Sequence, residues 1–167
     1  MAGNNPKKHE IRALVKSFVC AFSGLAFCIK NERNMRIHFT VLFYIIILSL
    51  FYSLNRAEYA VLFLTFGLVI AAEAVNTSIE TIVNLLSPTY NHLAKLAKDI
   101  AAASVLISGI AAVCVGFCLF FDIEKLCFIA RYFICTEHLI YTILLALSVP
   151  AAIVFVFKGP AVFMKKV

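Results

Sequence analysis

The fold is decided by residues 59–86, which read YAVLFLTFGLVIAAEAVNTSIETIVNLL. The run is apolar and longer than the roughly 20 residues that a helix needs to cross a bilayer. Near its end it carries two carboxylates, an amide and a hydroxyl at helical spacing: Glu73, Asn76, Thr77 and Glu80. These four side chains share one helix face. Charged groups inside a spanning helix are costly, so this polar stripe predicts a functional site.

The composition excludes a soluble globular domain. Of 167 residues, 63% are hydrophobic and only 14% are charged, whereas about half are apolar in soluble proteins. The net charge of +6 comes from Lys and Arg at segment ends, which indicates membrane topology and not a nucleic-acid surface. The six cysteines form no CxxC pair, and we expect them to be small buried hydrophobes. The first eight residues lack the pattern of a signal peptide, so none is expected.

The periodicity predicts an all-α integral membrane protein. Residues 9–30 place apolar side chains at helical spacing opposite basic ones, which is typical of an amphipathic helix on the membrane surface. Three further apolar runs, at 37–54, 93–121 and 139–157, join 59–86 as predicted spans. The third span is rich in Ala, Ser and Gly, which lets membrane helices approach closely. Residues 122–138 form a more polar stretch between the last two spans.

The distribution of basic residues predicts the orientation. Only Arg56, Lys125 and Arg131 fall on one side of the four predicted spans, and the other twelve Lys and Arg residues fall on the opposite side. The more basic side is expected to be cytoplasmic, and it includes the N-terminus. We expect one membrane domain over residues 1–121, followed by an extra C-terminal segment over residues 122–167.

Depth along the second span separates its two carboxylates. Glu73 lies 16 residues beyond Ala57, or about 24 Å along a helix, so it lies near the cytoplasmic face of a hydrocarbon layer about 30 Å thick. Glu80 is about 10 Å further along and reaches the interface. Glu32, Lys98 and Asp99 come from other segments but end at the same interface, where they could form one site.

These residue types suit phosphoryl chemistry. Glu32 and Glu80 could bind Mg²⁺, which takes one or two carboxylates together with substrate phosphates, and Lys98 could hold a phosphate. Glu73, with apolar neighbours, suits a proton acceptor. Structural alternatives stay open: Glu32 could belong to a solvated charged turn, Glu73 could bond a neighbouring helix, and Asn76 with Thr77 could join helices by hydrogen bonds.

Three blocks of sequence carry a resemblance to a known family. They are the 31–39 block NERNMRIHF, the 73–80 block EAVNTSIE and the 97–102 block AKDIAA. In order and spacing they resemble the small prokaryotic diacylglycerol kinase and undecaprenol kinase family, over roughly residues 9–121. The Glu-Arg-Asn form of the first block is more similar to the undecaprenol kinase branch.

The resemblance implies a kinase in the bacterial cytoplasmic membrane that transfers the γ-phosphate of ATP to a lipid alcohol, undecaprenol first and diacylglycerol second. It also implies a homotrimer with composite sites shared between chains. The roles it implies are a general base, Glu73; Mg²⁺ ligands, Glu32 and Glu80; and nucleotide or phosphate contacts, Lys98, Asp99, Asn76, Tyr90 and Asn91.

The chain departs from the family pattern at three places. Asn84 stands where the family usually has Asp, which removes a charge one turn after Glu80. Ala13 stands where the family has an arginine, so Arg12 or Lys16 would have to replace it in binding the nucleotide. The fourth span lies outside the resemblance.

Two other classes of protein remain open at this point. A small proton-coupled transporter subunit could use Glu73 alone, but it would have no use for Glu32, Glu80, Lys98 and Asp99 at one depth. A membrane subunit without catalysis is the third possibility, and Asn84 keeps it open. Phosphorylation of lipid alcohols by purified protein distinguishes the three.

Overall fold

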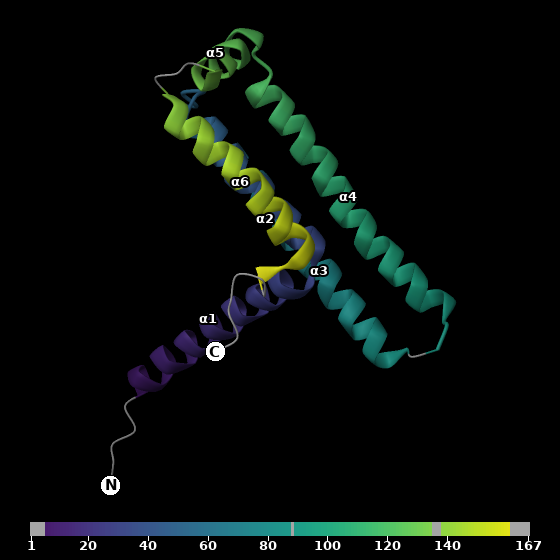
Figure 1. Cartoon of the computed structure of the whole chain (residues 1–167). Helices are drawn as coiled ribbons and strands as arrows, with labels where there is room; N and C mark the ends of the chain where they lie inside the picture. The colour runs from purple at the N-terminus through teal and green to yellow at the C-terminus, as the bar shows by residue number, and fades with distance from the viewer. Residues whose placement is uncertain (1–5, 88, 135–137, 161–167) are drawn as a thin grey trace.

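The computed structural model describes residues 6–87, 89–134 and 138–160. Six α-helices account for nearly all of them: α1 (Pro6–Asn31), α2 (Arg33–Ser49), α3 (Arg56–Leu86), α4 (His92–Phe120), α5 (Ile123–Ile134) and α6 (Leu139–Lys158). In Figure 1, α4 runs back beside α3, α5 lies across one end of the molecule, and α1 leaves the other helices at a steep angle. The predicted all-α membrane fold is confirmed.

Helix α3 begins earlier than predicted because of its N-terminal cap. The Asn55 side chain accepts hydrogen bonds from the backbone N–H groups of Ala57 and Glu58 at 2.9 and 3.0 Å, and Glu58 Oε2 accepts from the Asn55 N–H at 2.7 Å. This capping box satisfies donors that a helix start leaves free. Residues 55–58, which lie before the predicted span at 59–86, are thus the cap and first turn of α3.

Four helices are long and apolar enough to cross a membrane: α1 between Glu10 and Asn31, α3, α4 and α6. Helix α2, which was predicted as a span, has 17 residues and is therefore about 26 Å long. Residues 50–53 form a turn directly after it. By length and composition α1 therefore qualifies as a candidate span and α2 does not, which is the reverse of the prediction. Helix α2 packs between α3 and α6, whereas α1 leaves the bundle, so a surface position for α1 stays a prediction.

The polar stretch after α4 contains a helix that the sequence reading missed. Helix α5 spans 12 residues and alternates Glu, Lys and Arg with apolar residues. Helix α6 confirms the predicted run at 139–157 as helical and packs against α2. There the Tyr44 and Ser148 hydroxyls lie 3.0 Å apart in a hydrogen bond. The C-terminal segment is therefore attached to the same bundle.

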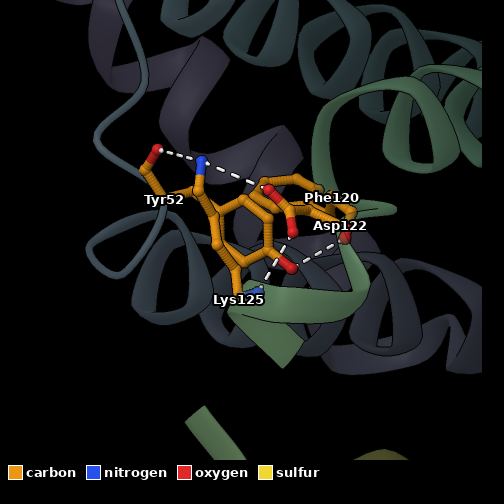
Figure 2. Close-up of polar contacts among 4 residues, drawn as sticks. All are labelled: Tyr52, Phe120, Asp122 and Lys125. Atoms are coloured by element: carbon orange, nitrogen blue, oxygen red, sulfur yellow. Dashed lines mark hydrogen bonds and ion pairs between the residues drawn. The ribbon is translucent and has the colours of Figure 1, made fainter. Parts of the chain in front are cut away.

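One end of the bundle is closed by a cluster of four residues shown in Figure 2. The Tyr52 hydroxyl donates to the Phe120 carbonyl at 2.7 Å, and the two rings pack edge to face. Lys125 Nζ lies 3.7 Å from Asp122 Oδ2 and 5.2 Å from the centre of the Tyr52 ring.

The expectation that the cysteines are buried is wrong for most of those in the described residues. Cys28 is buried, but Cys20, Cys114, Cys118 and Cys127 are exposed, and all five are free thiols. For Cys114 and Cys118, which lie on the candidate span α4, contact with lipid is the physical reason, because an apolar side chain on a membrane helix avoids water without contacting protein. The sixth cysteine, Cys135, lies outside the described residues.

Candidate active site

The polar stripe of α3 faces the interior of the molecule. Glu73 is 1% exposed, Thr77 4% and Asn76 7%, while Glu80 is half-buried. The Thr77 hydroxyl donates to the Glu73 carbonyl at 3.0 Å, one helical turn back. This bond uses the backbone carbonyl of Glu73 and not its side-chain carboxylate, so the carboxylate can bind partners outside α3.

The junction between α1 and α2 brings a second carboxylate to the level of Glu73. Helices α2 and α3 run antiparallel. Glu73 lies 17 residues beyond Arg56, the first residue of α3, and α2 is 17 residues long. Glu73 is therefore level with the beginning of α2, where Glu32 is the N-cap residue and makes no side-chain capping bond. Glu32 and Glu80 both lie close enough for their charges to act on Glu73, and Asn34 in the first turn of α2 is also near it.

Two acceptor atoms at this site have no partner among the described residues. They are Glu73 Oε2 and Asn76 Oδ1, both buried. The amide nitrogen of Asn76 is occupied, because it donates to Glu80 Oε1 at 3.2 Å. Buried polar atoms are nearly always hydrogen-bonded. Two such acceptors on one face of α3 therefore mark a place for a donor or a cation from outside the chain.

The other predicted site residues are not gathered around Glu73. Lys98 Nζ, partly exposed, donates to Asn84 Oδ1 at 3.2 Å and so joins α4 to α3 beyond Glu80. Asp99 and Tyr90 are exposed, and so is Lys16 on α1. No hydrogen bond or ion pair within the described ranges links these three to Glu73.

Asn91 has a local structural role that the sequence reading missed. Its side chain accepts hydrogen bonds from the backbone N–H groups of Leu93 and Ala94 at 2.9 and 3.2 Å, which makes it the N-cap of α4. The signal was present, because Asn directly before an apolar helical run is typical of a cap. Asn34 was missed as a neighbour of Glu73 because it comes from a different helix.

The donor set fits Mg²⁺. Glu32 and Glu80 supply carboxylates from two elements, and the free Asn76 oxygen lies beside Glu80. Within the described ranges no three His, Cys, Asp or Glu residues are grouped closely enough to enclose a metal ion. Mg²⁺ does not need such an enclosure, since it commonly takes one or two carboxylates and completes its shell with water and substrate phosphates.

An apolar cavity of about 720 Å³ lies between α2, α3 and α4. Asn34 and His38 line it near the level of the site, and Leu62 and Phe120 line it near the closed end. Val69, one turn before Glu73, is also part of its wall. The cavity therefore extends along the bundle from about one turn before Glu73 toward the closed end.

The fold and site define a class: a multi-pass helical membrane protein with buried, unpartnered acceptors where its polar interface meets an apolar cavity. The chain belongs to the prokaryotic diacylglycerol kinase family, whose sequence pattern matches residues 19–120. That match ends where α4 ends, so α5 and α6 lie beyond it.

Individual relatives agree with this assignment. A diacylglycerol kinase of Synechocystis is 44% identical over 108 residues, which are 64% of this chain and 61% of the relative's length. An undecaprenol kinase of Bacillus subtilis is 31% identical over 68% of this chain and 92% of its own length. A diacylglycerol kinase of Helicobacter pylori is 29% identical over 61% of this chain and 80% of its own length.

Proposed function

We propose that this protein is a membrane lipid kinase that transfers the γ-phosphate of ATP directly to the hydroxyl group of a lipid alcohol. The observation that carries the proposal is the Glu73 carboxylate, which is 1% exposed and lies within a turn of the wall of an apolar cavity. Its Oε2 atom has no hydrogen-bond partner in the part of the chain that the structure describes. A buried acceptor at that position suits the hydroxyl end of a molecule whose tail occupies the cavity.

The chain's own groups account for the proton transfer. Glu73 accepts the proton of the lipid hydroxyl while the hydroxyl oxygen forms its bond to the γ-phosphorus. The bond from that phosphorus to the bridging oxygen breaks, and ADP leaves. The products are the lipid phosphate, ADP and the proton on Glu73, which returns to water before the next turnover. Asn34 is placed to orient the carboxylate.

We assign neutralisation of the phosphate charge to a metal ion held by Glu32 and Glu80 and to Lys98. Glu32 and Glu80 would hold Mg²⁺, with Asn76 fixing the Glu80 carboxylate through its amide hydrogen bond. When bound, the metal supplies positive charge to the phosphate oxygens. Lys98 lies on the same side of the bundle and adds a second cation for the nucleotide phosphates.

Undecaprenol is the first proposed acceptor and diacylglycerol the second. The Glu-Arg-Asn form of residues 32–34 favours undecaprenol. The identity of 44% to a protein named diacylglycerol kinase, against 31% to one named undecaprenol kinase, favours diacylglycerol. The apolar cavity accepts either tail, since its wall offers few polar groups.

We also propose a homotrimer with shared sites, because the site of a single chain is incomplete. Asp99, Tyr90 and Lys16 are exposed and make no hydrogen bond or ion pair with Glu73 within the described ranges, and many apolar side chains of α3 and α4 are exposed. A neighbouring copy could bring such residues to the nucleotide. We place residues 1–121 in the kinase domain, with the N-terminus and the site on the cytoplasmic side of the inner membrane.

The test is ATP- and Mg²⁺-dependent phosphorylation by the purified full-length protein in mixed micelles. Undecaprenol, diacylglycerol and ceramide are offered separately at equal mole fraction, and the phosphorylated lipid is quantified. We expect phosphate transfer to at least one alcohol, with undecaprenol preferred. Absence of transfer to all three would reject the kinase and leave the transporter and the non-catalytic subunit. Preference for diacylglycerol would reverse the order of substrates only.

A further inference from the structure

A second charged group is buried next to the site, and the proposed reaction does not use it. Arg36 on α2 is 6% exposed. Its Nε donates to the carbonyl of Val156 at 2.9 Å, and its Nη1 donates to the carbonyls of Ile29 and Lys30 at 3.1 and 3.0 Å. No carboxylate pairs with this guanidinium within the described ranges, so backbone carbonyls compensate its burial.

Those carbonyls belong to the C-terminal turns of two different helices. Ile29 and Lys30 end α1, and Val156 ends α6. Carbonyls in a last turn have no partner within their own helix, and the helix dipole concentrates negative charge there. One arginine therefore caps α1 and α6 together and ties the C-terminal segment to the junction between α1 and α2.

The chain turns sharply directly after α6, close to the Val156 carbonyl that accepts from Arg36. Gly159 follows α6 with φ of 73°, a backbone conformation that favours glycine. A Cβ atom at this position would lie 3.5 Å from Arg36 Nη1. About two turns further along α2, the Tyr44 to Ser148 hydrogen bond is a second and separate link between α2 and α6.

We propose that Arg36 is a positioning residue and that α6 acts through it to hold the junction that presents Glu32. Glu32 is one helical turn from Arg36 and occupies the N-cap position of α2 at that junction. The C-terminal segment, outside the family match, is thus a built-in brace for the metal-binding end of the site. This inference rests on the proposed function only for the role given to Glu32.

The kinetic test compares four full-length variants with the wild type. In Arg36→Gln the Mg²⁺ concentration for half-maximal phosphorylation should rise about 10-fold, as for the loss of a supporting contact to a metal ligand, while the KM for lipid stays unchanged. Gly159→Val should cause a rise in the same direction from the α6 side. Arg36→Lys should restore part of the loss, and Tyr44→Phe should leave the Mg²⁺ dependence unchanged.

A second readout does not require kinase activity. Cys28 is buried, and its carbonyl accepts the Glu32 N–H at 2.7 Å, so its thiol reports on the same junction. Alkylation of Cys28 by N-ethylmaleimide, followed by peptide mass spectrometry, should be about fivefold faster in Arg36→Gln and faster in Gly159→Val, because the junction opens more often. Tyr44→Phe should match the wild type.

The possible outcomes distinguish the proposed role of Arg36 and α6 from the proposed kinase activity. An inactive wild type with fast Cys28 alkylation in both variants rejects the proposed function but supports the brace. Unchanged Cys28 alkylation in Arg36→Gln overturns the brace even if the protein is an active kinase. Changes in Arg36→Gln without any in Gly159→Val would overturn the role of α6. A fall in kcat with unchanged Mg²⁺ dependence would overturn the positioning of Glu32.

Discussion

The two ends of this bundle treat buried polar groups in opposite ways. At the closed end, the buried Tyr52 hydroxyl donates to the Phe120 carbonyl, and the partly exposed Lys125 and Asp122 side chains pair with each other. At the other end, Glu73 is as buried as Tyr52 but retains an oxygen without a hydrogen-bond partner among the described residues.

The difference shows which polar groups stabilise the fold and which ones lower its stability. Polar groups that have partners hold helices together, as the closed end does for α2, α4 and α5. Polar groups left without partners cost folding free energy, and they persist where a ligand completes them. Four substitutions test this contrast, in order of decreasing expected effect.

The largest effect is expected for Glu73→Gln. The amide cannot accept the hydroxyl proton, so turnover should fall by about 10²- to 10⁴-fold. Binding of ATP with Mg²⁺ should be nearly unchanged, because Glu32 and Glu80 remain. The measurements are initial rates of lipid phosphorylation and equilibrium binding of a non-hydrolysable ATP analogue.

Glu58→Gln is the matched control, since it makes the same change on the same helix at the opposite end. Glu58 accepts a capping hydrogen bond from Asn55, so its loss should leave turnover unchanged. Turnover in Glu73→Gln equal to that in Glu58→Gln would rule out Glu73 as the base.

Asn76→Ala should give the next largest effect. It removes the hydrogen bond to Glu80 Oε1 and the free Asn76 oxygen beside it. The Mg²⁺ concentration for half-maximal activity should rise by about 10-fold, as for loss of a supporting contact to a metal ligand. Ser78→Ala, on the exposed face of α3, is the control. An equal Mg²⁺ requirement in both variants would contradict the metal site.

At the closed end, Tyr52→Phe should affect stability and not chemistry. It removes one of the two hydrogen bonds that the Phe120 carbonyl accepts, the other coming from the Asp122 N–H at 3.0 Å, so the loss should cost about 0.5–1.5 kcal/mol. Thermal unfolding in detergent should occur at a lower temperature, while turnover per folded molecule stays constant. Tyr59→Phe is the comparison, because the Tyr59 hydroxyl has no hydrogen bond within the described ranges. Lower turnover with unchanged unfolding temperature would contradict the structural role.

The smallest effect is expected for Asn84→Asp. The new carboxylate would pair with Lys98, which now bonds the Asn84 amide oxygen. A partly exposed ion pair is worth less than about 1 kcal/mol, so the KM for ATP should rise no more than about fivefold and kcat should not change. A large gain in kcat would mean that Asn84 limits activity in this chain.

The sequence predicted the parts of the site that lie on one helix. Glu73, Asn76, Thr77 and Glu80 share a face because helical spacing is regular, and their burial agrees with that prediction. The pairing of Lys98 with Asn84 was not predicted, since it depends on how α4 returns beside α3. The link from Arg36 to Val156 joins residues 120 positions apart, and no local pattern encodes it.

By itself, the sequence determined that the chain is an all-helical membrane protein, where its long helices run, and that one carboxylate lies near the end of a span. These properties follow from hydropathy and helical period, which are local. Only the tertiary structure decided that Glu32 lies level with Glu73 and that the last turn of α6 accepts a hydrogen bond from Arg36. It also decided that two buried acceptors have no partner among the residues it describes. Such contacts depend on packing between segments distant in the chain, where small differences in helix length and angle select the partners.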